Sequence, residues 1–134
     1  MSYLIDSDWL IDTLRGIPTA IEVMEKQSGH GLSISVITLG EVYEGIFQQP
    51  NSEKRLSELR EVLEGHVILG LTDPIMQVFA RTRSTLRRSG QLIPDMDLLI
   101  ASTAIVHDLT LITRNLRHFR RISDLKLYAA DDEA

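Results

Sequence analysis

Short apolar runs alternate with longer amphipathic segments along the chain, and this alternation constrains the fold more than any other feature of the sequence. Strands that alternate with helices are joined by right-handed crossovers, which build a mainly parallel sheet covered by helices. The runs that we interpret as strands are 3–5, 32–37, 67–69, 109–113 and 125–128. We therefore expect an α/β protein: a three-layer α/β/α domain with a mainly parallel sheet of four or five strands.

The segments between these runs carry signals for the starts and ends of helices. Ser7 or Asp6 can cap a first helix that Gly16 ends, and Asp73 followed by Pro74 is typical of the start of a long helix. The helices that we expect are 8–15, 18–28, 38–48, 53–64, 73–89, 95–107 and 116–121.

Length and composition limit the domain count and the class of protein. A chain of 134 residues has the size of one domain, so we expect a single domain over residues 1–134. The lack of cysteine excludes disulfides, thiolate zinc sites and cysteine nucleophiles. No apolar run approaches the ~18 residues of a membrane span, and the N-terminus lacks the basic region of a signal peptide. We expect a cytoplasmic protein with no membrane partner.

The net charge of −5 conceals a basic block. Residues 81–121 carry eight arginines and three aspartates, a net charge of +5, whereas residues 1–80 have a net charge of −7. The planar guanidinium group of arginine matches phosphate or carboxylate geometry well. The block therefore indicates either a local phosphate-binding face or a set of surface arginines paired with the glutamate-rich segment 53–64.

Acidic side chains lie near the ends of the predicted strands, where folds of this class bind ligands. Asp6 follows the first strand, Glu41 lies one helical turn past the second, and Asp95 and Asp97 open the helix before the fourth. Each acid also has an ordinary structural explanation. Thr38 and Glu41 fit a capping box, and the aspartates complement helix dipoles. Taken singly, each acid is better explained by that structural role.

Taken together, the acids favour a metal site. Several carboxylates in one crevice repel one another and raise each other's pKa values, and a divalent cation relieves that repulsion. With oxygen ligands and no cysteine, Mg²⁺ or Mn²⁺ is the natural ion. Such ions bind phosphate oxygens and activate water, which is the chemistry of metal-dependent phosphodiester hydrolysis. The four histidines show no ligand spacing, and His118 is the one expected nearest the site.

Four segments stand in order along the chain: 3–8 (YLIDSD), 37–41 (ITLGE), 93–104 (IPDMDLLIASTA) and 111–119 (LITRNLRHF). They resemble the successive motifs of PIN-domain ribonucleases, and most of all those of the VapC-type toxins of bacterial toxin–antitoxin pairs. The resemblance extends over nearly the whole chain. It implies a PIN-like fold and a metal-dependent endoribonuclease that hydrolyses RNA phosphodiester bonds with activated water.

The resemblance also implies residue roles. Asp6, Glu41 and Asp97 take the three core acidic positions of the family, and Ser7 takes the hydroxyl position beside the first acid. By this resemblance Asp6 and Asp97 would hold Mg²⁺ or Mn²⁺, while Glu41 would hold a second ion or orient the water.

The chain departs from the family pattern after the fourth predicted strand. Neutral Asn115 stands where a fourth acid is often found, and His118 replaces the acid often seen before the following phenylalanine. Asp95 is the best substitute acid in the sequence. Thr113 and Asn115, at the end of the fourth strand, are further supporting residues.

The resemblance implies two partners, an RNA substrate and a small VapB-type antitoxin. We predict RNA contacts from the basic block, at Arg83, Arg87, Arg88, Arg114 and Arg117.

For the antitoxin, we expect an arginine of its tail to pair with the acids through bidentate hydrogen bonds. Its apolar residues would bind along residues 38–47, where five side chains offer more apolar surface than one helix face buries: Leu39, Val42, Tyr43, Ile46 and Phe47. We expect a homodimer, or a hetero-oligomer with the antitoxin.

Three other interpretations remain open. A catalytically silent PIN fold used only for binding is the most serious, because Asn115 and His118 depart from the family pattern. Haloacid dehalogenase-like phosphatases share an Asp-x-Asp motif, here Asp6 and Asp8, but need a lysine near the site, and no lysine lies at a suitable strand end. A receiver-like phosphorylation switch expects an aspartate after the third strand, where 67–71 has none.

Overall fold

A five-stranded, fully parallel sheet forms the centre of the computed structural model, which describes residues 2–29 and 31–128. The strands are β1 (Tyr3–Ile5), β2 (Leu32–Ser35), β3 (Val67–Leu69), β4 (Thr110–Ile112) and β5 (Lys126–Leu127), in the spatial order β3-β2-β1-β4-β5. The prediction of a parallel sheet of four or five strands is confirmed. The end of the predicted domain, 129–134, lies outside the described residues.

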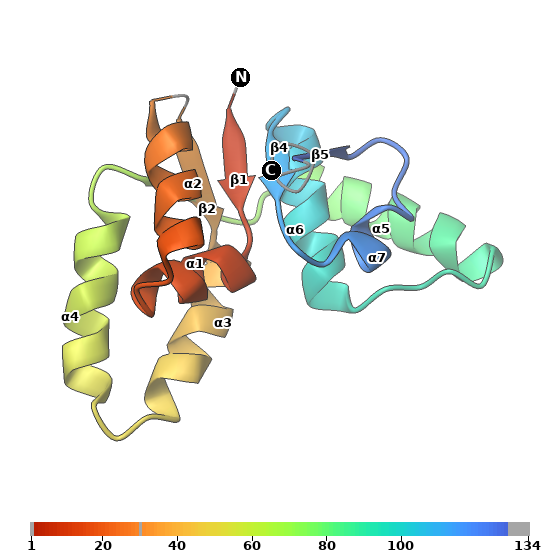
Figure 1. The fold of residues 1–134 in the computed structure, drawn as a ribbon. Coiled ribbons are helices and arrows are strands. Elements are labelled where there is room, and N and C mark those ends of the chain that lie inside the picture. The colour runs from red at the N-terminus through yellow and green to blue at the C-terminus, as the bar shows by residue number, and fades with distance from the viewer. Residues whose placement is uncertain (1, 30, 129–134) are drawn as a thin grey trace.

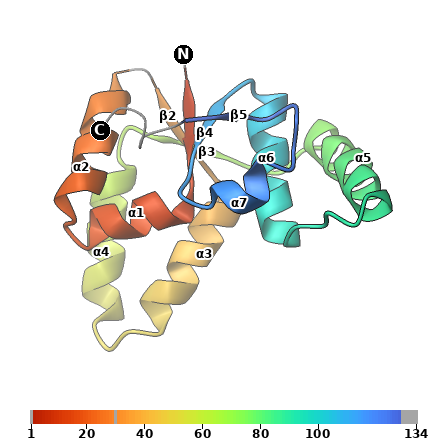
Figure 2. The same cartoon turned by 45° about the vertical axis from the view of Figure 1, so that its right-hand side comes forward.

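Helices cover both faces of this sheet (Figures 1 and 2). They are α1 (Ser7–Leu14), α2 (Pro18–Ser28), α3 (Val36–Phe47), α4 (Ser52–Leu63), α5 (Asp73–Arg88), α6 (Asp95–Val106) and α7 (Leu116–Phe119). Helices α1 to α4 lie on one side and α5 to α7 on the other, which gives the expected three-layer α/β/α arrangement.

Alternate side chains of the inner strands face opposite cores, as the two-residue period of a strand requires. In β1, Tyr3 and Ile5 pack with α1 to α4, whereas Leu4 packs with α5 to α7. In β4, Ile112 joins the first core and Leu111 the second. Strands buried on both faces have apolar residues at every position, which explains why these runs are apolar without alternation.

The predicted helix boundaries agree with the structure to within two residues, and the start of α3 is one of the places where the difference reaches two. The second strand ends at Ser35, and α3 starts at Val36 instead of Thr38. Ser35 is the N-cap, because its hydroxyl oxygen accepts a hydrogen bond from the backbone N–H of Ile37 at 3.1 Å. The proposed capping box of Thr38 and Glu41 is therefore wrong, and Glu41 lies within the helix.

The strand order places a topological switch point between β1 and β4. The chain continues from β1 to β2 on one side, whereas β4 joins the sheet on the other side of β1. In open parallel sheets, the loops that diverge at such a point form a crevice beyond the carboxyl ends of the strands. The end of β1 and the end of β4 are thus the places to look for a site.

Within residues 2–29 and 31–128, no helix is long and apolar enough to cross a membrane.

Candidate active site

Asp6 lies at the centre of the switch point, directly after β1. Strand pairing aligns Ile5 with Ile112, and the backbone N–H of Asp6 donates to the carbonyl oxygen of Ile112 at 2.9 Å. The side chain is 5% exposed. One carboxylate oxygen, Oδ1, accepts from the backbone N–H of Ser7 at 2.7 Å, so Asp6 is also the N-cap of α1. The other, Oδ2, accepts from the Thr113 hydroxyl at 2.7 Å.

Burial makes ionisation of Asp6 unfavourable. Its pKa is raised from 3.8 to about 7, first by burial and then by the negative charge of Asp8, while the hydrogen bonds from Thr113 and Ser7 oppose the rise. The charge of Glu41 raises this pKa further. Capping a helix does not require an aspartate to be buried near other acids, where its ionised form is destabilised. This environment therefore favours a functional role for the Asp6 carboxylate.

Glu41 reaches the same region from α3. Its pKa is raised, mainly by burial and also by the charges of Asp97 and Asp8, while a hydrogen bond with the Ser7 side chain lowers it. Its oxygen Oε1 is buried with no hydrogen-bond partner among the described residues. A buried, unpaired carboxylate oxygen is costly, which indicates a group that a ligand satisfies.

Asp97 enters from the first turn of α6, and its side chain is 17% exposed. Its Oδ2 atom is contacted by the Asn115 amide nitrogen at 3.2 Å and by the His118 Nδ1 atom at 2.8 Å. The structure therefore brings both residues that depart from the family pattern into contact with one of the three predicted core acids.

Thr113 and Asn115 connect Asp6 to Asp97. The Thr113 hydroxyl donates to Asp6 and accepts from the backbone N–H of Asn115 at 3.0 Å, while the Asn115 side chain contacts Asp97. Two residues after β4 thus contact the carboxylates that arrive from β1 and α6. Both of these predicted supporting residues lie beside the acidic group, by which we mean Asp6, Asp8, Glu41 and Asp97.

Asp8 belongs to this region, although the sequence reasoning did not include it among the site residues. It accepts from the backbone N–H of Arg114 at 2.8 Å, which ties the start of α1 to the loop after β4. Its pKa is raised, mainly by burial. The Asp-x-Asp spacing after β1 was the available signal, since Asp8 follows the same strand as Asp6.

Asp95, the predicted substitute acid, points elsewhere. Its side chain is 59% exposed, and Oδ1 pairs with the Arg83 Nε atom at 2.8 Å. Asp95 does not appear among the charges that shift the pKa of Asp6 or Glu41. His118, and not Asp95, is the neighbour of Asp97.

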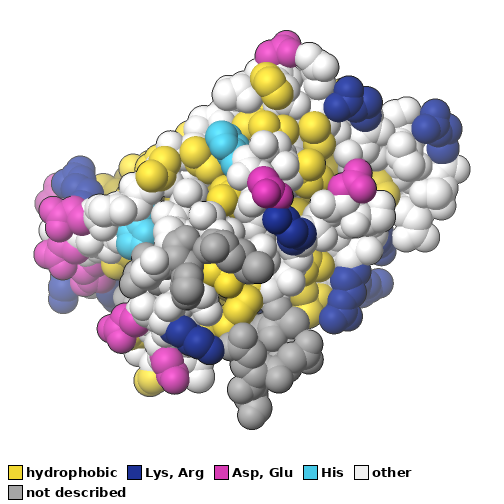
Figure 3. Space-filling model, turned by 90° about the horizontal axis from the view of Figure 1, so that it is seen from above, with side chains coloured by type: hydrophobic (Ala, Val, Ile, Leu, Met, Phe, Trp, Pro, Cys, Tyr) yellow, Lys and Arg dark blue, Asp and Glu magenta, His cyan; other side chains and the backbone are white. Residues whose placement is uncertain are grey.

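The five arginines predicted to contact RNA fall into two groups. Arg83 pairs with Asp95, and Arg114 pairs with Asp12 and lies 4.0 Å from the ring centre of Trp9, so both guanidinium groups are engaged within the chain. Arg87, Arg88 and Arg117 are exposed. The face at the amino ends of the strands, at the opposite end of the sheet, shows acidic and basic side chains interspersed (Figure 3).

The acidic group fits a hard divalent cation in its donor chemistry. Its oxygens are carboxylates that raise one another's pKa values, and Glu41 supplies an unpaired buried oxygen. As placed, no three acidic or histidine side chains among residues 2–29 and 31–128 converge closely enough to hold a metal ion. The residues therefore fit the ion by type and charge, without forming a finished coordination shell.

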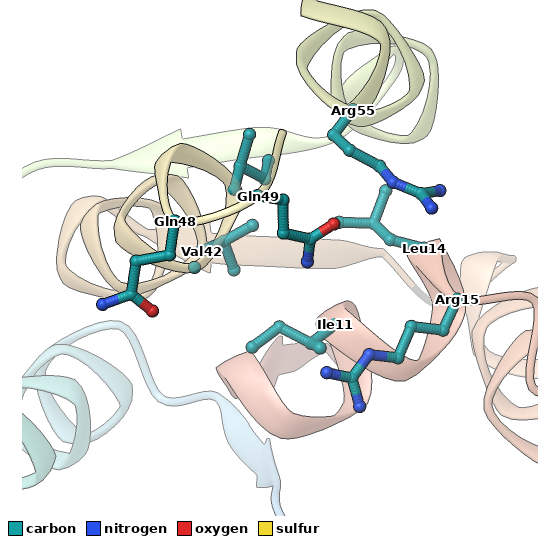
Figure 4. A pocket seen from close by; sticks show the side chains of 9 residues that line it. Ile11, Leu14, Arg15, Val42, Gln48, Gln49 and Arg55 are labelled. Carbon is teal, nitrogen blue, oxygen red and sulfur yellow. The ribbon is translucent and has the colours of Figure 1, made fainter. Parts of the chain in front are cut away.

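A pocket of about 300 Å³ lies between α1, α3 and α4 (Figure 4), and its lining includes none of the four acids. Its apolar lining comes from Ile11, Leu14, Val42 and Ile46. Ser7, Ile11 and Leu14 share one face of α1 through their helical spacing, so this face runs from the acidic group to the pocket. Five further residues complete the lining: Arg15, Gly45, Gln48, Gln49 and Arg55.

The predicted apolar surface of α3 is mostly core. Val42 and Ile46 are buried, while Leu39 and Tyr43 are partly buried against the same core. Phe47 alone of the five is strongly exposed, at 63%, and stacks on Tyr43 with ring centres 6.1 Å apart.

Known proteins resemble the chain over nearly its whole length. Residues 3–125 match the PIN domain family. Ribonuclease VapC19 of Mycobacterium tuberculosis is 33% identical over 125 residues, which cover 92% of this chain and 96% of the relative. Ribonuclease VapC2 of Rickettsia felis is 29% identical over 131 residues, covering 95% and 96%.

Solved structures agree with this assignment. The structure of VapBC2 from Rickettsia felis, bound to a DNA fragment from their promoter, contains a chain that superposes with a TM-score of 0.89 at 27% identity, covering 96% of this chain and 98% of that one. VapBC-1 from nontypeable Haemophilus influenzae gives 0.84 at 26% identity, covering 96% and 97%. The resemblance of the four sequence motifs is confirmed: the chain belongs to the PIN domain family and, within it, to the VapC ribonucleases.

Proposed function

We propose that this chain is the endoribonuclease toxin of a VapBC-type toxin–antitoxin pair, and that Mg²⁺ or Mn²⁺ supports its cleavage of RNA. The observation that supports the proposal is the electrostatic coupling of Glu41, whose charge raises the pKa of Asp6 and whose own pKa is raised by the charge of Asp97, together with a buried Glu41 oxygen that lacks a partner among the described residues. Relatives named as VapC ribonucleases support the choice of RNA as substrate.

In this proposal each side chain has a defined task. Asp6 and Asp97 would hold the cation, and Thr113, Asn115 and Ser7 keep these carboxylates and Glu41 in place. Held there, Mg²⁺ or Mn²⁺ would supply positive charge for the phosphodiester oxygens and would make a water molecule more acidic. Glu41, whose raised pKa favours proton uptake, orients the attacking water and accepts its proton.

The test is RNA cleavage by three variants in Mn²⁺. Asp6→Asn and Asp97→Asn each remove one ligand charge but keep the side-chain shape, so cleavage should fall by more than about 100-fold. Asp73→Asn changes an exposed acid on α5 and is the matched control, with cleavage at the wild-type rate. The melting temperature of the Asp6 variant should equal or exceed that of the wild type, because a buried repulsive charge is lost. Wild-type cleavage by Asp97→Asn would contradict the assignment, and a wild type that binds RNA without cleaving it would favour a catalytically silent module.

We also propose that a VapB-type antitoxin is the partner that holds this activity in check. Structural relatives are VapBC assemblies, and the pocket between α1, α3 and α4 offers a partly apolar binding surface, in which Ile11 stands about one helical turn along α1 from Ser7. In this arrangement, apolar residues of one antitoxin segment would bind in the pocket. An arginine of the same segment would pair with the ionised carboxylates of the acidic group. Arg15 and Arg55 border the pocket, so an acidic residue in the segment would find a counter-charge there. We expect the free toxin to be a homodimer, which light scattering in solution measures.

A further inference from the structure

His118 and Asn115 place two nitrogen atoms around one oxygen of Asp97. The His118 Nδ1 atom lies 2.8 Å from Asp97 Oδ2, the Asn115 Nδ2 atom lies 3.2 Å from it, and the two nitrogen atoms are 2.9 Å apart. No role at the site has yet been assigned to His118, which stands where the family often has an acid.

The 2.8 Å contact between His118 Nδ1 and the Asp97 carboxylate decides the arrangement of protons, and the 2.9 Å contact between the two nitrogen atoms then joins two donors that share Oδ2 and is not itself a hydrogen bond. If Nδ1 carried a lone pair, that lone pair would face the ionised Asp97 oxygen at 2.8 Å, which is repulsive. A proton on Nδ1 turns the same contact into a charge-assisted hydrogen bond. The Asn115 amide then donates to the same oxygen, because its carbonyl oxygen at that position would repel the carboxylate.

We propose that His118, together with Asn115, positions Asp97 for the cation by donating to Oδ2, which leaves Oδ1 as the oxygen that binds the ion. His118 is a positioning residue and not a ligand, because its Nδ1 atom is used on Asp97. The inference rests on the proposed metal-dependent function and deepens it. In this site, His118 and Asn115 stand where the family often has acids, and they act as neutral hydrogen-bond donors to one of the three core carboxylates.

The strength of this effect follows from what outer-shell partners do in other metal sites. A hydrogen-bond donor fixes the rotamer of a ligating carboxylate, and losing such a partner typically lowers metal affinity by about 10- to 100-fold. Since Asp97 is largely buried and its Oδ2 has both of these donors, removing His118 should leave Asp97 free to rotate.

The experiment measures Mn²⁺ affinity by electron paramagnetic resonance, independently of cleavage. His118→Ala removes the donor, His118→Asn keeps an amide nitrogen at the position of Nδ1, and His118→Gln places one at the position of Nε2. We expect a loss of about 10-fold or more for Ala and Gln, and a dissociation constant within about threefold of the wild type for Asn. His107→Ala, at the exposed C-cap of α6, is the matched control and should bind Mn²⁺ normally.

The outcomes separate this inference from the proposed function. Failure of the wild type to bind Mn²⁺ overturns both, and binding that survives Asp97→Asn overturns the assignment of the ion to Asp97. If Asp97→Asn abolishes binding but His118→Ala does not weaken it, the positioning role alone is wrong. Rescue by Gln instead of Asn would contradict the role of Nδ1. In the metal-free protein, nitrogen-15 NMR at about pH 8.5 should show the neutral Nδ1–H tautomer of His118, and an Nε2–H tautomer would overturn the inference without reference to metal.

Discussion

The carboxyl group of Asp6 links the stability of the metal-free protein to pH. Its pKa is about 7 in the folded chain because it is buried and lies near Asp8, whereas an unfolded aspartate titrates near 3.8. Between these values the folded state holds the proton that the unfolded state has lost. The contribution of Asp6 to the free energy of unfolding is therefore highest below about pH 4, and it falls as the pH rises toward 7.

The first prediction follows from that difference. The free energy of unfolding of the metal-free protein should fall between about pH 4 and pH 7, with an Asp6 contribution of about 4 kcal/mol as an upper limit. Asp8 and Glu41, whose pKa values are also raised, add to the same trend. Asp6→Asn should flatten the curve, while Asp73→Asn should leave it unchanged. Urea denaturation across this pH range measures it, and the same slope in wild type and Asp6→Asn would refute the role of Asp6.

Single residues also show where sequence reasoning reaches its limit. Asp6, Glu41 and Asp97 could be predicted as one group, because each stands at a fixed place relative to a strand end. The roles of Asp95 and His118 could not, since they depend on side-chain direction within the first turn of α6 and within α7. Asp95 turns to Arg83, and His118 turns to Asp97.

At the scale of the elements, the boundaries were predictable where a strong local signal exists. Gly16, with φ of 75°, follows α1 as expected, and Pro74 lies in the first turn of α5. The start of α3 was misplaced because Ser35 has two roles, as the last residue of β2 and as the N-cap of α3. Apolar and polar residues alternate from Leu32 past the end of β2, so this period of two does not reveal that the strand ends and the helix begins after Ser35.

The pocket between α1, α3 and α4 gives a prediction about the antitoxin. Gly45 lines this pocket, and a Cβ atom there would meet no atom within 4 Å, so we expect Gly45→Leu to place its side chain in the pocket. We expect weaker antitoxin binding, measured by calorimetry, with cleavage of RNA unchanged. Gly40→Leu is the control: it lies on the same helix, is exposed, has equally open space and gains about the same helix propensity. Equal antitoxin affinity in both variants would exclude this pocket as the docking site.

The arginines of α5 and α7 give a prediction about RNA. Arg87, Arg88 and Arg117 are exposed, whereas Arg83 is already paired, so the first three are the better candidates for phosphate contacts. Changing these three residues to alanine, singly and together in a triple variant, should weaken RNA binding. The slope of log K against log salt concentration should become shallower by roughly 0.7–0.9 for each phosphate contact that is lost. Arg60→Ala, on α4, is the control and should change neither quantity. An unchanged salt slope in the triple variant would return these residues to ordinary surface roles.

At the scale of the whole molecule, sheet topology explains how distant parts of the sequence form one site. The pairing of β1 with β4 places Asp6 beside Thr113, and α3 and α6 bring Glu41 and Asp97 close enough for the charge of Asp97 to raise the pKa of Glu41. The overall charge of −5 tells little about this arrangement, because the acids gather at the switch point while exposed arginines lie on α5 and α7. A parallel sheet was predictable from the alternation of elements, and its switch point required the strand order.

In the proposed reaction, water activated at this acidic group hydrolyses RNA. The decisive experiment is cleavage of a short RNA in ¹⁸O-labelled water, with Mn²⁺ present or chelated. We expect Mn²⁺-dependent cleavage, ¹⁸O in the product phosphate, no 2′,3′-cyclic phosphate, and loss of the reaction in Asp97→Asn. Cleavage that survives chelation and yields a cyclic phosphate without ¹⁸O would show attack by the RNA's own 2′-hydroxyl group, and would contradict the proposed reaction.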